Sequence, residues 1–338
     1  MLRPVFDDLG PEITPPADSD GDGKGDTTGQ QLTPRAGAGR MINRIHRIVV
    51  RQVRRLTPGM IRIEFWVHSG GDLDGFGSSG VGDEYVRLFL PGPGQAAPTM
   101  PIATDDGYWR FPEGVEPSPM RCYTVRAWDA ENGCLTIDFV VHDGGVAAAW
   151  ALRAQPGDVL ASNTPRGLSE PPDDSTWRLL VADATGLPAA ARLLEQAPPG
   201  VRTRAVLEVA SSQDRQPIAL PPNADLQWVY GGNGHGPSRL DQIVRGTELP
   251  DGPGYVWVAG EARTTRLVRK YLRHELRLPG TAYKVVGYWT EGAEAWQRRY
   301  EELPESTRSA LAAMWDDATR DADEIEDEYE DALERLGL

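Results

Sequence analysis

The residues best suited to chemistry form a basic and aromatic set in the segment RCYTVR, residues 121–126. Side chains alternate between the two faces of a strand, so Arg121 and Tyr123 share one face and Thr124 and Arg126 the other. A guanidinium binds phosphate oxygens bidentately, and a tyrosine ring covers a flat heterocycle. The pattern favours a planar, phosphate-bearing ligand. A structural strand whose arginines lie along the surface fits it equally well.

A second candidate set follows the next expected strand, where His142 precedes DGG and the helical segment VAAAWALRA, residues 146–154. Two glycines before a helix leave backbone N–H groups available to an anion. An ordinary strand-to-helix turn is the alternative. Together with Arg121, this segment makes flavin the simplest candidate ligand.

Other motifs are incomplete. GGNGHG, residues 231–236, lacks the G-x-G-x-x-G spacing of dinucleotide sites. DSDGDGKGD, residues 18–26, opens like a calcium loop, but Gly29 stands where the closing glutamate belongs. We find no zinc spacing, nucleophile elbow or Walker sequence, so hydrolytic and phosphoryl-transfer chemistry are unsupported.

The net charge of −15 over 338 residues is concentrated in the tails. Residues 293–338 alone carry 15 acidic and 5 basic side chains, whereas residues 41–292 carry 28 acidic and 26 basic ones. No basic face dominates, which excludes nucleic acid as the expected partner. No apolar run reaches the roughly 20 residues of a membrane span. Cys122 and Cys134 are expected to be reduced, since a hairpin turning at residues 129–133 would pair residue 122 with a position near 140. These features predict a cytoplasmic protein without membrane insertion.

The elements that must position these residues fall into two kinds. From residue 42 to about 163, short alternating segments such as IRIEFWVH, residues 61–68, predict a small antiparallel barrel. From residue 176, strand and helix patterns alternate, which predicts a parallel sheet with crossovers. The expected domains are a flexible tail (1–41), a barrel domain (42–170), an α/β domain (176–292) and an acidic C-terminal helical extension (293–338).

In the extension, apolar residues recur at steps of three and four between Leu311 and Leu333. This spacing predicts an amphipathic helix packed on its own chain, with a coiled-coil dimer as the less favoured alternative. Its acidic face is expected to be solvated and to need no partner.

The segment from RCYTVR to residue 167 resembles the siderophore-interacting proteins, a family of FAD-containing ferric-siderophore reductases within the ferredoxin–NADP reductase-like superfamily. DEYVRLFLP, VADATGLPAAARLLE, YVWVAGEARTTRLVRKYLRHEL and VVGYW match the family in the same order. The resemblance implies a six-stranded antiparallel FAD-binding barrel followed by a Rossmann-like nucleotide domain. The FAD-binding positions that it implies are Arg121, Tyr123, Thr124, His142, Gly145, Val146, Ala147, Ala148 and Trp150.

The resemblance also implies two further groups of residues. The nicotinamide-nucleotide side would include Asp183, Thr185, Gly260 and Glu261. An anionic ferric siderophore would meet Arg87, Arg166 and Arg266. The chain departs from the family at Val146 and Ala148, where proline and serine are common, and at Ala184 and Thr164, where an acid and a glycine are common.

The expected function is therefore FAD-dependent reduction of a ferric siderophore, with NADPH or NADH, or else ferredoxin, as electron donor and iron(II) released in the cytoplasm. The flavin carries the chemistry, so no catalytic side chain and no protein-bound metal are expected, and the protein is expected to be a monomer. Two alternatives remain: a general NAD(P)H–flavin oxidoreductase of the ferredoxin-reductase type, and a non-catalytic siderophore-binding or iron-delivery protein.

Overall fold

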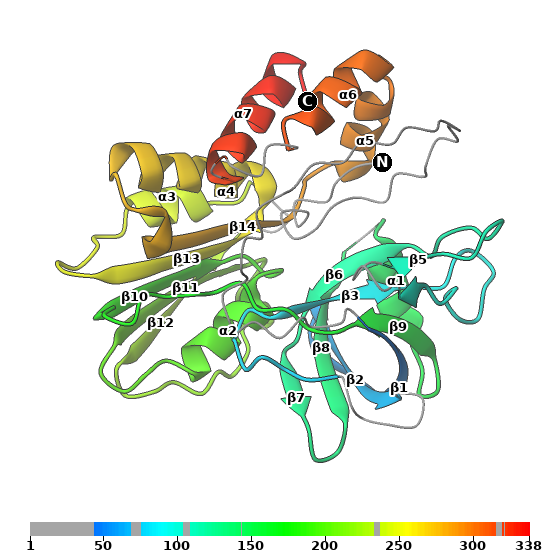
Figure 1. Cartoon of the computed structure of the whole chain (residues 1–338). Coiled ribbons are helices and arrows are strands. Elements are labelled where there is room, and N and C mark those ends of the chain that lie inside the picture. The colour runs from blue at the N-terminus through cyan, green and yellow to red at the C-terminus, as the bar shows by residue number, and fades with distance from the viewer. Residues whose placement is uncertain are drawn as a thin grey trace, which may run out of the picture.

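The structure is a computed structural model that describes residues 44–68, 76–103, 109–142, 144–232, 237–315, 320 and 322–338. An antiparallel barrel and a parallel α/β sheet lie next to each other, and a C-terminal helical extension lies beside the α/β sheet (Figure 1). The expected tail and its calcium-like sequence lie outside the described residues. No helix in the described part of the chain is long and apolar enough to cross a membrane.

The first sheet has the strand order β6-β3-β9-β1-β2-β8-β7. Its strands are β1 (Ile45–Thr57), β2 (Met60–His68), β3 (Tyr85–Phe89), β6 (Met120–Thr124), β7 (Ala127–Asp129), β8 (Cys134–Val140) and β9 (Val159–Asn163). The two edge strands β6 and β7 are separated by only two residues, so they are halves of one bent strand that closes the sheet. The prediction of a six-stranded antiparallel barrel is confirmed.

The barrel interior follows the alternation seen in the sequence. Ile61, Ile63, Phe65 and Val67 of β2 are all buried in its core. On the other face of the same strand, Arg62 donates to both carboxylate oxygens of Asp138 on β8 at 2.7 Å. A two-stranded ribbon, β4 (Ile102–Ala103) with β5 (Trp109–Arg110), and one helix, α1 (Val146–Arg153), complete the domain.

The second sheet is parallel, with the order β12-β11-β10-β13-β14. Its strands are β10 (Trp177–Ala182), β11 (Arg202–Val209), β12 (Ala224–Tyr230), β13 (Gly254–Glu261) and β14 (Tyr283–Trp289). Apolar clusters on both of its faces explain why the central strands read as continuous apolar runs. The sequence prediction of a parallel sheet is confirmed.

Helices cover the two faces of this sheet. The longer ones are α2 (Leu187–Glu195) on one face and α3 (Leu240–Arg245) with α4 (Ala262–Lys270) on the other. Three short turns are η1 (Ser212–Asp214), η2 (Tyr271–Glu275) and η3 (Gly280–Ala282). The helical pattern of residues 264–276 in the sequence continues after Lys270 as a π-helical turn.

The extension contains three helices, α5 (Ala293–Glu301), α6 (Glu305–Ala313) and α7 (Ala322–Arg335). Leu311 and Leu333 meet in a small core with Tyr300 and Leu338. The predicted packing on the chain itself is confirmed, but the expected single helix is wrong, because α6 ends at Ala313 and α7 begins at Ala322. The expectation of an unpartnered acidic face is wrong, because Glu330 and Asp331 of α7 pair with Arg266 and Lys270 of α4.

The expected pairing of Cys122 is also wrong. The strand bends at Val125 and Arg126, so Cys122 on β6 lies opposite Arg87 on β3, and only β7 pairs with β8. Both cysteines are reduced, as expected, with Cys134 buried and Cys122 half-buried.

Candidate functional site

The bend between β6 and β7 interrupts the hydrogen-bonded ladder of the barrel wall. Arg126 N still donates to Thr136 O at 2.9 Å, and β7 continues the ladder with β8. Before the bend, β6 pairs with β3, and no ladder between β6 and β8 forms in the described structure. We call this region the seam, defined by residues 120–124 on one side and residues 137–142 with 144–145 on the other. Both candidate sets from the sequence flank it.

Tyr123 is held in the seam by a chain of aromatic rings. Its ring lies 4.4 Å from that of Phe139 on β8, and Phe139 lies 5.8 Å from Trp150 of α1 (centroid distances). Burial raises the pKa of Tyr123, so its phenol is neutral at physiological pH. Trp150 is itself a core residue, stacked on Phe65 at 6.3 Å. Trp150 therefore packs against Phe139, which in turn contacts Tyr123.

The other side of the seam ends at the start of α1. Gly145 is the N-cap residue, and no side chain caps this start. Ala149 N makes the first helical bond, to Gly145 O, which leaves the three preceding N–H groups without a helical acceptor. A Cβ on Gly145 would lie 2.4 Å from the His142 ring, so only glycine allows the ring to approach this closely. This uncapped start suits an anion.

Arg121 stands on the opposite side of the seam from α1. Its side chain is exposed, and its Nη1 donates to the neighbouring Met120 carbonyl at 2.7 Å. That local bond leaves the outer edge of the guanidinium facing solvent. A cation on β6 and an uncapped helix start beyond β8 form a donor set that suits a diphosphate.

Three implied positions on α1 differ in exposure. Val146 is exposed, whereas the side chains of Ala147 and Ala148 are buried. A side-chain contact from position 148 would therefore require a rearrangement of α1. Their backbone N–H groups, in contrast, have no helical acceptor.

Thr124 lies on the other face of β6. It is buried, and its Oγ1 makes no well-formed hydrogen bond with the described residues. The Tyr288 hydroxyl, on β14 of the second domain, lies beside it, and burial raises the pKa of that phenol. This buried hydroxyl at the boundary between the two domains can still form a hydrogen bond, and it suits a polar atom at the edge of a ring-shaped ligand. Tyr288 lies in the VVGYW segment, to which the sequence assigned no role.

Two of the three candidate siderophore arginines share one corner of the barrel. Arg87 lies two residues from Tyr85 on β3. Tyr85 and Arg166 exchange backbone hydrogen bonds of 2.8 and 3.0 Å. Just before Arg166, the Thr164 hydroxyl lies 3.3 Å from Nε2 of the buried His46. Thr164, where the family commonly has glycine, thus makes a side-chain contact with His46 that glycine could not make.

Arg266 lies elsewhere, on α4. Its Nε is 2.6 Å from Oε2 of Glu330 on α7, and its side chain is only 20% exposed. The structure therefore does not bring Arg266 into the corner of Arg87 and Arg166, and it gives this arginine an acidic partner within the chain.

The carboxyl end of the parallel sheet holds the nucleotide-side candidates. Asp183 is fully buried, and one of its carboxylate oxygens accepts from Thr185 N and Oγ1 at 2.8 and 2.6 Å. Its other oxygen accepts from Trp289 Nε1 at 2.6 Å and leaves no room for a Cβ on Gly260. Burial raises the pKa of this carboxyl. Asp183 therefore accepts hydrogen bonds from Thr185 and Trp289 and so holds the carboxyl end of the sheet together.

Glu261 at the same edge has one carboxylate oxygen in use. Its Oε2 caps α4 by accepting from Thr264 N at 2.8 Å. Its Oε1 is buried and makes no hydrogen bond among the described residues. This oxygen is the one nucleotide-side feature here that retains hydrogen-bonding capacity toward a ligand.

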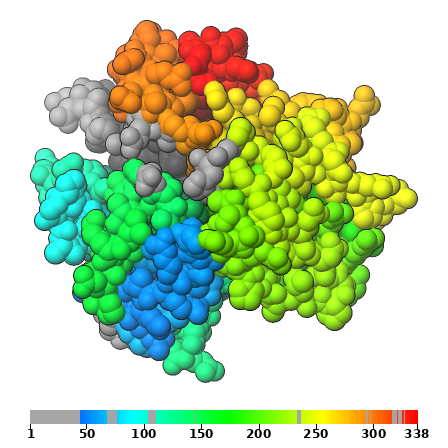
Figure 2. Space-filling view, turned by 180° about the vertical axis from the view of Figure 1, so that it is seen from behind, coloured from blue at the N-terminus to red at the C-terminus, as the bar shows by residue number. Residues whose placement is uncertain are grey.

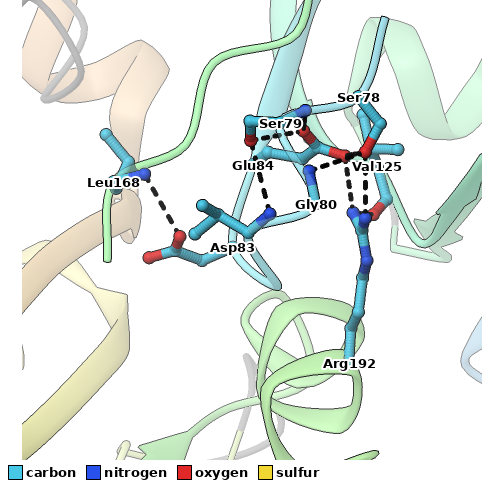
Figure 3. A network of polar contacts seen from close by, with 9 residues as sticks. Ser78, Ser79, Gly80, Asp83, Glu84, Val125, Leu168 and Arg192 are labelled. Atoms are coloured by element: carbon cyan, nitrogen blue, oxygen red, sulfur yellow. Dashed lines mark hydrogen bonds and ion pairs between the residues drawn. The ribbon is translucent and has the colours of Figure 1, made fainter. Parts of the chain in front are cut away.

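A network of polar contacts connects the second domain to the bend between β6 and β7 (Figure 3). No short sequence motif predicted this network. Arg192 of α2 donates from Nη1 to Glu84 Oε1 at 2.8 Å and to Val125 O at 2.7 Å. Nearby, Asp83 accepts from Leu168 N at 3.1 Å and from Trp257 Nε1 at 2.8 Å. A third contact, from Arg126 to Glu195, is bidentate at 2.7 and 2.9 Å. Arg126 is therefore structural.

Two family profiles match the chain. Residues 49–169 match the siderophore-interacting FAD-binding domain, and residues 175–292 match the siderophore-interacting protein profile. These ranges cover the barrel and the parallel sheet but stop before the extension.

Individual relatives agree with the profiles. The NADPH-dependent ferric-chelate reductase of Escherichia coli is 32% identical over 73% of this chain and 93% of its own length. The ferric vibriobactin reductase ViuB of Vibrio cholerae is 30% identical over 75% and 93%. A siderophore utilization protein from T. fusca has a solved structure with a TM-score of 0.66 and 34% identity, covering 74% of this chain and 94% of its own.

Proposed function

The chain belongs to the siderophore-interacting protein family, and from this membership we propose that it is an FAD-dependent reductase that uses NADPH to reduce iron(III) held by a siderophore, releasing iron(II) in the cytoplasm. The observation that carries the proposal is the seam. Arg121 with Tyr123 on β6, and the uncapped start of α1, lie on the two sides of the seam within the segment that matches the FAD-binding profile.

Each part of the seam has a role toward FAD. Arg121 and the backbone N–H groups of Val146, Ala147 and Ala148 bind the diphosphate, with His142 at its side. Tyr123, supported by Phe139, covers one face of the flavin ring. The Thr124 hydroxyl donates to a polar atom of the ring edge. Gly145 keeps the turn narrow enough for these contacts.

FAD, when bound, supplies the redox chemistry by accepting a hydride from a nicotinamide and giving single electrons to the ferric chelate. The protein's task is to bind and orient the reactants. The neutral, half-buried phenol of Tyr123 brings no charge and no titrating proton to the ring face. Within the described residues no cluster of His, Cys, Asp and Glu is arranged to hold a metal ion. In this proposal iron is part of the substrate, held by the siderophore.

The substrate site lies at the corner of Arg87 and Arg166. Siderophores hold iron(III) with hard oxygen donors, many of them in anionic complexes, and reduction weakens that binding. Two cations fixed by the pairing of β3 with residue 166 attract such a complex electrostatically. Arg266 lies on α4, outside this corner, and pairs with Glu330.

The nicotinamide nucleotide approaches the carboxyl end of the parallel sheet, as ligands of open α/β sheets do. Thr185 and Gly260 line this edge, and Glu261 offers its unused Oε1 to a ligand N–H or O–H group. Asp183 acts indirectly by holding Trp289 in place.

The visible spectrum of the purified full-length protein tests the proposal. We expect flavin absorption that bleaches without oxygen on addition of NADPH and returns when a ferric siderophore is added, with iron(II) trapped by ferrozine. Protein that lacks flavin and takes up no added FAD would refute the reductase and favour a binding protein. Bleaching with equal reduction of all ferric chelates would favour a general flavin oxidoreductase. Parallel trials with NADH and reduced ferredoxin identify the donor.

A further inference from the structure

The guanidinium of Arg192 on α2 holds the barrel at the residue that follows Thr124. Its Nη1 donates to Val125 O at 2.7 Å and to Glu84 Oε1 at 2.8 Å. The backbone of Glu84 completes the arrangement, because its carbonyl accepts from Val125 N at 2.9 Å. Both polar backbone groups of Val125 are therefore held by the two members of one ion pair.

This ion pair is shielded from solvent and its polar atoms are bonded (Figure 3). Val125 and Glu84 have no exposed surface, and Arg192 is 8% exposed. The second carboxylate oxygen of Glu84 accepts from Ser79 N and Oγ, each at 2.7 Å, and Arg192 Nη2 donates to Ser78 Oγ at 3.2 Å. A buried ion pair adds little stability compared with apolar side chains of the same size, and such pairs can instead fix one arrangement of the parts that they join.

The helix that carries Arg192 begins at the edge of the parallel sheet that we assign to the nucleotide. Gly186 is the N-cap of α2, and the buried carboxylate of Asp183 accepts from Thr185 N at 2.8 Å and from Gly186 N at 3.3 Å. The blue and green atoms of the barrel adjoin the yellow-green atoms of the α/β domain in the space-filling view (Figure 2). The nine residues of α2, about 13 Å long, thus connect this edge to the end of β6.

Transfer of a hydride from NADPH, which is oxidised, to FAD, which is reduced, depends on the distance between the two rings. Reacting atoms must come within about 3–3.5 Å, and a misplacement of about 1 Å can lower the rate about 100-fold. In the proposed function the two rings are bound by different domains, the flavin at β6 and the nicotinamide at the carboxyl end of the parallel sheet. A contact that fixes β6 against α2 therefore also determines how closely the rings meet.

We propose that Arg192 is a positioning residue for hydride transfer, which acts through Val125 by holding Tyr123 and Thr124 in place relative to the nucleotide edge. The inference rests on the proposed function, because it requires FAD at the seam and a nicotinamide as donor. Arg192 contacts neither ligand, and the diphosphate contacts at Arg121 and α1 do not involve it. Its loss therefore lowers the rate of flavin reduction and leaves both affinities nearly unchanged.

The contact between Arg126 and Glu195 offers a matched control. It also joins α2 to the barrel, through two hydrogen bonds of 2.7 and 2.9 Å. However, it engages a side chain and leaves the backbone of the strand untouched. Glu195→Gln thus weakens the contact between the domains without removing a bond to the strand backbone.

The first test measures reduction of the flavin by NADPH in a single turnover of FAD-loaded full-length protein, mixed without oxygen. Arg192→Lys keeps a positive charge beside Glu84 but lacks the planar guanidinium that bonds Glu84, Val125 and Ser78. We expect its rate to fall about tenfold, with the Kd values of FAD and NADP+ within about twofold of wild type. Glu195→Gln should keep the rate and both Kd values within about twofold. Equal rates in the two variants, whether unchanged or lowered, would overturn the inference.

Hydrogen exchange of the wild-type protein gives a second measurement that needs no variant. Adding FAD to full-length apoprotein should slow exchange of the amides in residues 192–196, which contact no ligand in this proposal, because ordering of β6 stabilises its bond to α2. Residues 240–245 of α3, on the other face of the sheet, should not respond. Unchanged exchange at residues 192–196 with FAD bound would also overturn the inference.

The two failures are distinguishable. If NADPH reduces the wild-type flavin but Arg192→Lys matches Glu195→Gln, the inference fails and the proposed function stands. If the wild-type protein binds no FAD, or its flavin is not reduced by NADPH, both fail.

Discussion

Arg192 of α2 and Glu84 of the barrel form a buried ion pair, with Nη1 2.8 Å from Oε1 and side-chain exposures of 9% and 0%. The same nitrogen of Arg192 also donates to the carbonyl of Val125, two residues after Tyr123. The two domains are therefore joined next to the strand to which we assign the flavin.

Replacing Arg192 with alanine should destabilise the protein strongly. Removal of one member of a buried pair leaves the other charge without compensation, which costs about 3–5 kcal/mol. Arg308→Ala, which breaks the exposed pair with Glu305 on α6, is the control and should cost less than about 1 kcal/mol. Urea unfolding followed by tryptophan fluorescence measures both. Equal losses for the two variants would contradict the assigned importance of the buried pair.

Arg121→Ala should weaken FAD binding about tenfold or more, since a hydrogen bond between charged groups contributes about 1.5–3 kcal/mol. Equilibrium titration of apoprotein with FAD, followed by flavin fluorescence, gives the affinity. Arg54→Ala removes an exposed arginine from β1 of the same barrel and should not change it. Retention of wild-type affinity by Arg121→Ala would exclude Arg121 from the diphosphate site.

Gly145→Ala should reduce FAD affinity by moving the His142 ring away from the start of α1. The new Cβ would lie 2.4 Å from His142 Cε1, so one of the two must move. Because the clash is with this ring, the double variant Gly145→Ala/His142→Ala should bind FAD no more weakly than His142→Ala alone. A further loss in the double variant would show that the glycine is needed for another reason.

His46 should make the protein less stable in acid. Burial, followed by the charge of Arg44, lowers the pKa of His46 from 6.5 to about 4. The folded state therefore favours the neutral ring, and this contribution is complete above pH 6.5 and is lost as the pH falls toward 4. His46→Gln, which cannot titrate, should show a shallower loss of unfolding free energy over that interval. Identical slopes for the two proteins would contradict this prediction.

Much of the fold follows from side-chain periodicity. The alternation in β2 and the apolar runs of β10 and β13 predict the barrel and the parallel sheet correctly, because burial on one or two faces leaves a pattern within each strand. The seam could be predicted only in part. The sequence places Arg121 and Tyr123 on the same face of a strand, but only the structure shows where the strand ladder of the barrel is interrupted. The residues at the bend, Val125 and Arg126, are common in strands, so their types do not predict the bend.

The long-range ion pairs could not be predicted in the same way. Arg266 is separated from Glu330 by 64 positions, and Arg192 from Glu84 by 108. A charged residue in a sequence fits a solvated surface, a ligand site or a buried pair equally well, and only the tertiary arrangement decides among them. This is why the sequence indicated a solvated acidic face in the extension, where the structure has a salt-bridged helix.

The bend in β6–β7 also has a mechanical consequence. The carbonyl of Val125 and the guanidinium of Arg126 are both bonded to α2, one and two residues beyond Thr124. Rotating α2 away from the barrel would break these bonds or pull on the strand that carries Tyr123 and Thr124. Any relative motion of the two domains is therefore restrained at this segment.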